Sequence, residues 1–253
     1  MKNISHLKKS AKVFAIIEAR MTSRRLPGKV LLQVMGKPML ELMIERLSKA
    51  RTLDGIIIAT TVNATDDPVV ELAQQLGIRY HRGSEHDVLS RVIGAATEHD
   101  IDIIVEIPGD CPLIDPLYVD LCVNEYIKNE PDYVSSALSN SFPHGTEAQV
   151  FSTKTLQDVA SRTNDPVDRE HVSLYMYNNP HIYSIQSIVA SEEVAKNEIH
   201  LTLDEQKDYE LISTIFEHFY PENKEFTLID ILSYLDSTPG LLDINAHVNR
   251  TVI

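Results

Sequence analysis

A cluster of positive charge and hydroxyl groups follows the first apolar run of the sequence. The run, Val13–Ile17, predicts a strand that is buried on both faces. A loop with a Pro27-Gly28 turn comes next, and its charged and hydroxyl side chains are Arg20, Thr22, Ser23, Arg24, Arg25 and Lys29. A basic, hydroxyl-rich turn at the carboxyl end of a strand is typical of polyanion sites in α/β proteins. The alternative is a solvated basic loop between a strand and a helix.

Two carboxylates follow later predicted strands and are suited to a divalent cation. Asp110 comes after the predicted strand Ile101–Ile107, and Asp204 comes after the predicted strand Ile199–Leu203. Mg²⁺ is usually held by one or two carboxylates together with substrate phosphates. The alternatives are a turn or capping role for Asp110 and a helix N-cap at Asp204, with Asp208 supporting the first turn.

The spacing of these residues resembles a known family. Residues 19–29 (Ala-Arg-x-x-Ser-x-Arg-Leu-Pro-Gly-Lys), 36–40 (Gly-Lys-Pro-Met-Leu) and 109–113 (Gly-Asp-x-Pro-Leu) resemble segments of the sugar-activating cytidylyltransferases. These are the 3-deoxy-manno-octulosonate and acylneuraminate cytidylyltransferases, and Cys111 with the following Asp-Pro resembles the spore-coat polysaccharide F type in particular. The resemblance implies Mg²⁺ as cofactor on Asp110 and Asp204, and catalytic roles for Arg25, Lys29, Asp110 and Asp204.

The resemblance also implies a nucleotide site that draws on several segments. Residues 82–91 match a stretch that carries two arginines in the family, although Val88-Leu89 replaces the Ser-Gly-Thr type of loop found in the octulosonate enzymes. Arg91 lies inside a predicted helix, where a surface ion pair is an equal alternative. The implied nucleotide-binding residues are Ala19, Arg20, Ser23, Arg25, Lys29, Thr60, Arg82 and Asp87.

Two polar clusters in the second half are candidates for binding an acceptor. They resemble the spore-coat segments Phe-Pro-x-Gly-x-Glu and Arg-Glu-His-Val, and a solvated helix face is the alternative for residues 169–171. The acceptor-binding candidates are His144, Glu147, Arg169 and His171, of which His171 could assist deprotonation of the acceptor.

Composition narrows the class of protein. The formal net charge of -14 argues against general binding to nucleic acid or to anionic membranes. Two cysteines without metal or disulfide spacing, and no signal peptide, predict a cytoplasmic protein. The polar leader Met1–Ser10 is expected to be a frayed terminus.

Predicted strands and helices alternate along the first half of the chain, and these elements must position the residues named above. Strands at Val13–Ile17, Gly55–Thr61, Ile78–His81 and Ile101–Ile107 alternate with helices, which predicts an α/β fold: a mixed, mainly parallel, doubly wound sheet. The family resemblance specifies the Rossmann-like nucleotide-diphospho-sugar transferase type. We expect a single domain over 1–253, in which residues 130–190 form a small acceptor and dimerisation lobe. Further predicted elements are strands at Asp132–Ser136, Glu147–Phe151 and Ile182–Ile188, and helices at Thr153–Arg162, Pro166–Asn178, Gln206–Phe219 and near Leu228–Leu235.

The function expected from the resemblance is a CTP-dependent cytidylyltransferase, dimeric, that activates a sugar acid or a related surface-glycan precursor and releases pyrophosphate. A glycosyltransferase that uses a nucleotide sugar is one alternative. Its D-x-D pair would be Asp100-Ile101-Asp102, which is predicted at the wrong end of its strand. A non-catalytic nucleotide-binding module is the other.

Overall fold

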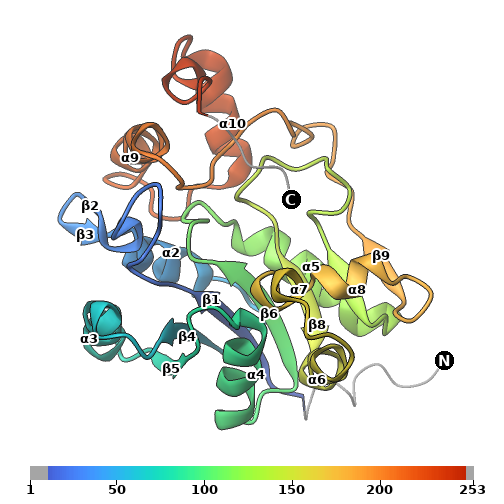
Figure 1. Ribbon diagram of the computed structural model, residues 1–253. Helices are drawn as coiled ribbons and strands as arrows, with labels where there is room; N and C mark the ends of the chain where they lie inside the picture. The colour runs from blue at the N-terminus through green and yellow to red at the C-terminus, as the bar shows by residue number, and fades with distance from the viewer. Residues whose placement is uncertain (1–10, 249–253) are drawn as a thin grey trace.

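The computed structural model describes residues 11–248, so the expectation for Met1–Ser10 lies outside the described residues. A seven-stranded sheet with the order β5-β4-β1-β6-β8-β7-β9 forms the centre (Figure 1). Its strands are β1 (Val13–Glu18), β4 (Gly55–Thr61), β5 (Arg79–Gly83), β6 (Ile103–Pro108), β7 (Tyr133–Ser135), β8 (Gln149–Ser152) and β9 (Ile185–Ser187). A short hairpin, β2 (Gln33–Val34) with β3 (Lys37–Pro38), stands apart from this sheet.

The sheet is mixed, as the sequence predicts. Strands β5, β4, β1 and β6 are parallel, whereas β8 runs antiparallel to both β6 and β7, and β9 is parallel to β7. Alternate residues of β1 enter two separate cores: Ala15 and Ile17 on one face, Phe14 and Ile16 on the other. Burial on both faces explains why the strand is a continuous apolar run.

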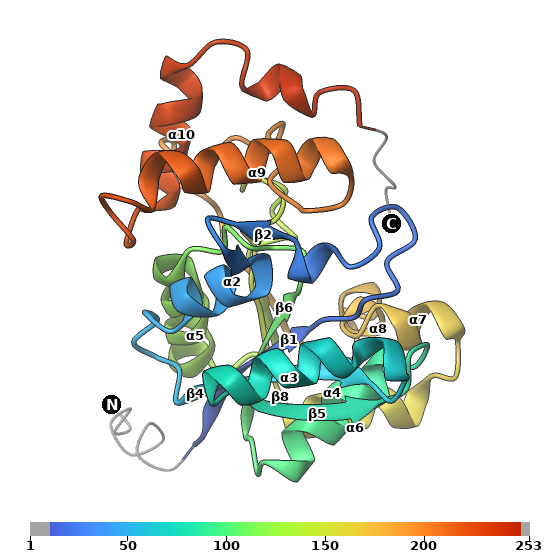
Figure 2. The same cartoon turned by 90° about the vertical axis from the view of Figure 1, so that its left-hand side faces the viewer.

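Helices cover both faces of the sheet (Figure 2). One core is shared with α2 (Met39–Leu47), α3 (Asp67–Leu76), α5 (Pro116–Asn129), α9 (Gln206–Phe219) and α10 (Leu228–Ser237). The opposite core is shared with α4 (Val88–Glu98), α6 (Thr153–Arg162) and α8 (Leu174–Asn178). The short helix α7 (Pro166–Glu170) contributes no buried residue. No helix in residues 11–248 is long and apolar enough to cross a membrane.

The sheet has its topological switch at β1. The chain passes from β1 outward to β4 and β5, and then returns to the other side of β1 as β6. Ligands of open α/β sheets bind in the crevice outside the carboxyl ends of the strands at such a point. Gly109 lets the end of β6 approach β1 closely, because a Cβ there would lie 2.6 Å from the carbonyl oxygen of Glu18. Asp110 is therefore presented directly beside the end of β1.

Two predicted elements differ from the structure. Residues 199–203 do not form a strand, since their ladder contact is a single bridge between His144 and His200. The N–H of His144 donates to the carbonyl oxygen of Ile199, and the N–H of Leu201 donates to the carbonyl oxygen of His144. The chain then turns toward Asp204, and the apolar residues of the segment are buried without forming a strand. The helix predicted over Pro166–Asn178 is two helices, α7 and α8, because the backbone leaves the helical region at His171.

The segment from 130 to 190 is continuous with the central sheet through β7, β8 and β9. The tyrosines of this segment can either contribute to the expected dimer interface or, as the alternative, pack in the protein's own core. The structure supports the alternative: Tyr133 and Tyr183 are buried, and Tyr175 and Tyr177 pack against the same core.

Candidate functional site

A cavity of about 420 Å³ opens at the switch point of the sheet. Its walls are the loop after β1, the end of β6, the start of α4, the end of α7 and the turn before α9. Five of its lining residues are cationic in a protein with a net charge of -14. The lining residues are Glu18, Arg20, Ser23, Arg24, Arg25, Lys29, Val30, Val88, Arg91, Pro108, Gly109, Asp110, Glu170, His171 and Asp204.

Lys29 lies between two carboxylates, and all three side chains line this cavity. Its Nζ is 2.8 Å from Oδ2 of Asp110 and 3.1 Å from Oδ1 of Asp204, and Nη2 of Arg25 is 2.9 Å from the same Asp204 oxygen. Burial favours loss of the Lys29 proton, but Asp110 and Asp204 outweigh it and raise the pKa of the ammonium. The cluster therefore holds two positive and two negative side chains in contact.

Backbone hydrogen bonds fix the two carboxylates relative to each other. The N–H of Leu203 donates to the carbonyl oxygen of Asp110 (2.8 Å), which places Asp204 beside Asp110. Asp208 is fully buried, and its Oδ2 accepts the N–H groups of Asp204 (3.1 Å) and Glu205 (2.9 Å) at the start of α9. Asp208 thus supports the turn that carries Asp204.

The basic loop is held in place by hydrogen bonds to residues that follow β4 and β5. The N–H of Met21 donates to Oδ1 of Asp66 (2.6 Å), and the N–H of Gly28, in the left-handed region at φ 72°, donates to the carbonyl of Met21 (2.9 Å). Glu85 accepts from Nη1 of Arg20 (3.2 Å) and from Oγ1 of Thr22 (2.5 Å). These bonds close the loop on itself, so that it curves around the cavity.

Buried acids lie under the cavity. Burial raises the pKa of Glu18 to about 7, although Arg91 acts against this, and burial also raises the pKa of Glu106, which lies on the adjacent strand β6. Oε1 of Glu18, Oε2 of Glu106 and Nε of Arg91 are all buried without a hydrogen-bond partner in the described residues. Glu18 and Arg91 line the cavity, so its wall includes buried polar atoms without a partner in the described residues.

The structure brings together only part of the nucleotide-binding set. Arg20, Ser23, Arg25 and Lys29 line the cavity, as do Asp110 and Asp204. Ala19 and Thr60 are buried in the sheet, so that neither side chain is exposed to the cavity. Arg82 points to the loop after β4, where it donates to the carbonyls of Thr61 and Asn63 and pairs with Asp67.

The acceptor set is also divided. His171 lines the cavity, but Arg169 forms an ion pair with Asp87, and neither of these two residues lines it. His144 stacks on His200 with ring centroids 4.4 Å apart, and its Nδ1 lies 3.4 Å from Glu147. Glu147 in turn accepts the N–H groups of Gly145 and Thr146. His144 and Glu147 thus shape the loop that bonds to residues 199–201.

Several lining residues were not in the predicted set. Glu18 precedes the predicted residue Ala19, and Glu170 follows the predicted residue Arg169. In each case the adjacent side chain lines the cavity and the predicted one does not, because successive residues of the chain point in different directions. Arg24 belongs to the basic loop, and Arg91 is buried on α4 with its Nη1 donating to the carbonyls of Ser84 and Glu85. For Arg91, helical position alone did not separate a surface from a buried side chain.

The donor set is compatible with Mg²⁺. Two carboxylates already converge on one positive charge, and they stand at the edge of a cavity large enough for phosphate groups. In residues 11–248 no group of three or more His, Cys, Asp or Glu side chains is arranged to hold a metal. A site with two protein carboxylates that is completed by substrate oxygens matches the usual preference of Mg²⁺.

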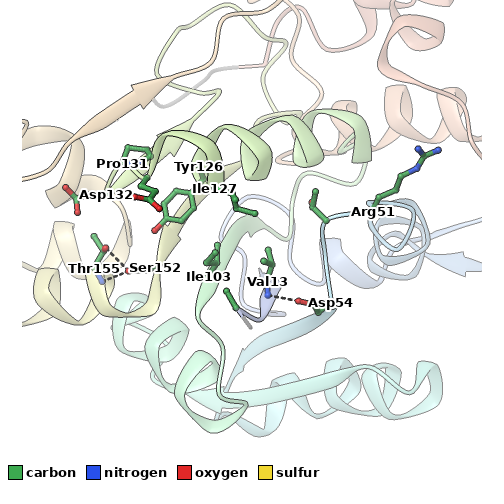
Figure 3. Close-up of a pocket in the computed structure, with 13 residues that line it drawn as sticks. Val13, Arg51, Asp54, Ile103, Tyr126, Ile127, Pro131, Asp132, Ser152 and Thr155 are labelled. Carbon is green, nitrogen blue, oxygen red and sulfur yellow. Dashed lines mark hydrogen bonds between the residues drawn. The ribbon is translucent and has the colours of Figure 1, made fainter. Parts of the chain in front are cut away.

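A second cavity, of about 380 Å³, lies at the amino ends of β1 and β6 (Figure 3). Its polar groups are largely satisfied by each other: Asp54 accepts the N–H of Val13, and Ser152 bonds to Thr155 (Figure 3). The Asp100-Ile101-Asp102 pair is at the same end of β6, where Asp102 accepts the N–H of Lys12. The expectation that this pair lies at the wrong end for a sugar-nucleotide site is confirmed.

The chain is similar to known proteins over most of its length. The family model described as cytidylyltransferase matches residues 14–230. The spore coat polysaccharide biosynthesis protein SpsF of Bacillus subtilis is 30% identical over 90% of this chain and 95% of its own. A 3-deoxy-manno-octulosonate cytidylyltransferase of Solibacter usitatus is 31% identical over 70% of this chain and 75% of its own.

A solved structure shares the fold. The structure of a cytidylyltransferase from Leptospira borgpetersenii superimposes with a TM-score of 0.87 at 30% sequence identity, covering 96% of this chain and 99% of that one. The mixed, mainly parallel seven-stranded sheet is thus that of a nucleotidyltransferase fold. The chain belongs to the cytidylyltransferase family.

Proposed function

We propose that the protein transfers a cytidylyl group from CTP to a sugar acid or a related surface-glycan precursor, with Mg²⁺ as cofactor. The observation that carries this proposal is the juxtaposition of Arg25 and Lys29 with Asp110 and Asp204 in one cavity. Nucleotidyl transfer needs mainly positioning and charge neutralisation. The cavity offers cations for the phosphates and carboxylates for a metal.

In this proposal the residues divide by charge. Arg20, Ser23, Arg25 and Lys29 bind the β- and γ-phosphates, the part that leaves as pyrophosphate, and stabilise its developing charge. Asp110 and Asp204 would hold Mg²⁺, which supplies Lewis-acid stabilisation at the α-phosphate. Asp208 acts through Asp204, since its carboxylate fixes the backbone of that residue.

The acceptor would enter from the side of α7. An oxygen of the acceptor attacks the α-phosphorus in line, the bond to the bridging oxygen of the β-phosphate breaks, and the acceptor proton is lost. His171 lines this side of the cavity and can take that proton, directly or through a water molecule. Glu170 stands next to it and can accept hydrogen bonds from acceptor hydroxyls.

A pyrophosphate-release screen tests the proposal. Each of the four NTPs is combined with Mg²⁺ and with 3-deoxy-manno-octulosonate, nonulosonates or sugar phosphates, and release is followed with a coupled assay. We expect release only with CTP and one acceptor class. Release of a nucleoside diphosphate from a sugar nucleotide would indicate a glycosyltransferase, and CTP binding without turnover across the panel would indicate a binding module.

We further propose that the protein is a homodimer that uses the segment between 130 and 190. Leu138, Ile182 and Val189 in this segment are exposed apolar side chains. Burial of such residues between two copies removes apolar surface from water. Sedimentation equilibrium at micromolar concentration should give a mass of two chains, and a mass of one chain would contradict the assignment.

A further inference from the structure

Lys29 occupies the space between the two carboxylates that are proposed to hold the metal. Its ammonium contacts Asp110 and Asp204 at 2.8 Å and 3.1 Å, and Arg25 contacts the same oxygen of Asp204 at 2.9 Å. The exposed fraction of the Lys29 side chain is 11%, so that solvent screens these contacts only weakly. One oxygen of each carboxylate is therefore already engaged by the protein's own cations.

The charges of this cluster balance without any ligand. A divalent cation that entered alone would add positive charge beside Lys29 and Arg25. A nucleoside triphosphate that entered alone would add negative charge beside Asp110 and Asp204. When both enter together, the phosphates attract the two basic side chains and the metal takes the two carboxylates, so that every charge again has an opposite partner.

The Lys29 side chain is suited to this exchange of partners. Its ammonium ends a flexible four-carbon stem, so it can turn from a carboxylate to a phosphate in the same cavity without a change in the backbone. The backbone around it is fixed, since Lys29 starts a 3₁₀ turn and its own N–H donates to the carbonyl oxygen of Leu26 (3.2 Å). Asp110 and Asp204 are equally fixed by the Leu203 hydrogen bond.

We propose that Lys29 makes the binding of metal and nucleotide mutually dependent: it is the counter-ion of Asp110 and Asp204 in the nucleotide-free protein, where it keeps metal affinity low, and the triphosphate draws it away. This inference rests on the proposed function, because it takes Asp110 and Asp204 as metal ligands and a nucleoside triphosphate as donor. By linkage, the metal and the nucleotide each raise the affinity for the other by the same factor.

The experiment measures binding of Mn²⁺ by the paramagnetic resonance of the free ion, and binding of CTP by calorimetry. In Lys29→Met we expect nucleotide-free protein to bind Mn²⁺ at least about tenfold more tightly than wild type, and to bind CTP at least about tenfold more weakly. Lys29→Gln should shift both affinities in the same directions. Lys29→Arg keeps the charge and should keep Mn²⁺ binding weak.

Lys49→Met is the matched control, because Lys49 is exposed, pairs with Glu225 at 2.9 Å and does not line the cavity. Neither affinity should change in it. Thermal unfolding confirms that each variant is folded, and Lys29→Gln supplies the measurement if Lys29→Met does not fold.

Two failures can be told apart. Unchanged or weaker Mn²⁺ binding in Lys29→Met and Lys29→Gln, in a protein whose wild type releases pyrophosphate from CTP, overturns the role of Lys29 and leaves the proposed function standing. A wild type that neither binds CTP nor releases pyrophosphate overturns the proposed function. A gain of Mn²⁺ affinity without a loss of CTP affinity contradicts the exchange, since the freed carboxylates would then bind metal independently of the nucleotide.

Discussion

Arg169 and Asp87 join two walls of the cavity through a two-pronged ion pair. Nε of Arg169 lies 3.0 Å from Oδ1 of Asp87, and Nη2 lies 2.6 Å from Oδ2. Asp87 also caps α4 by accepting the N–H of Ser90 (2.9 Å), and these contacts lower the pKa of its carboxyl although partial burial acts against them. Val88 and Glu170, the next residues on each side, line the cavity. The pair therefore sets the distance between the nucleotide side and the acceptor side.

Arg169→Met should lower turnover roughly fivefold while leaving CTP binding unchanged. Helix α7 buries no residue, so the ion pair is a main restraint on the position of His171. A paired arginine of this exposure contributes about 1 kcal/mol, which is roughly a factor of five in occupancy of the correct geometry. Steady-state kinetics with the acceptor found in the pyrophosphate screen, and calorimetry with CTP, separate the two effects.

Arg162→Met is the control for Arg169→Met, since Arg162 pairs with Asp158 at 2.6 Å on the surface of α6. It should leave both turnover and CTP binding unchanged. A loss of CTP affinity in Arg169→Met equal to the loss of turnover would show that Arg169 acts on the nucleotide.

Asp110→Asn should reduce turnover by about 10²–10³, comparable to removing one preorganised electrostatic group. Asp204→Asn should behave similarly, and the double variant should lose much less than the product of the two losses because both act through one ion. Asp158→Asn is the control, because Asp158 forms an exposed ion pair with Arg162 on α6. Near-full activity of Asp110→Asn at saturating Mg²⁺ would place the metal elsewhere.

The structure changes one expectation for these variants. The sequence, which shows no partner for Asp110 and Asp204, predicts that the two carboxylates repel each other and that removing one leaves the protein equally stable or slightly more stable. Lys29 and Arg25 pair with them, however. The loss of Asp110 therefore leaves a poorly exposed ammonium with one partner fewer, and we now expect a small fall in melting temperature.

Stability should fall as the pH rises through the neutral range, because of the buried acids under the cavity. The pKa of Glu18 is raised by burial from 4.5 to about 7. Between these two values the folded protein binds more protons than the unfolded chain, so its free energy of unfolding decreases with increasing pH. Glu106, whose pKa is also raised by burial, acts in the same direction.

Glu106→Gln removes one of these groups and should flatten the decrease above pH 4.5, with the variant more stable than wild type at the highest pH measured. Urea unfolding at a series of pH values measures this. Glu71→Gln, an exposed position on α3, should reproduce the wild-type curve. A Glu106→Gln curve parallel to wild type would show that the acid stays ionised in the fold.

Asp115→Ala should destabilise the protein by about 2–4 kcal/mol, because it leaves buried backbone donors without partners. Oδ1 of Asp115 accepts the N–H of Leu117 (2.8 Å) at the start of α5, and Oδ2 accepts the N–H of Leu228 (2.6 Å) at the start of α10. Chemical denaturation gives the free energy. Asp165→Ala removes an exposed cap, whose carboxylate accepts the N–H of Val167 at the start of α7, and should cost about 1 kcal/mol. Equal losses in the two variants would contradict the reason given.

The sequence by itself determined the elements with a strong local signal. Val13–Ile17 is apolar on both faces, and Asp115-Pro116 is a cap followed by a first-turn proline, so both are recognisable without a partner. The alternation of such elements gave the parallel half of the sheet, and the spacing from Ala19 to Lys29 gave the family. These features depend on neighbours along the chain.

Only the tertiary structure decided which charges meet. Lys29, Asp110 and Asp204 are separated by up to 175 residues, and their contact depends on β1 and β6 being neighbours and on the bond from Leu203 to Asp110. The same holds for Arg169 and Asp87, which were expected on different ligands and pair with each other instead. Residue type and spacing identify a side chain that can bind a charge, but the choice between ligand and protein partner is set by distance in the fold, because Coulomb attraction acts in space and not along the sequence.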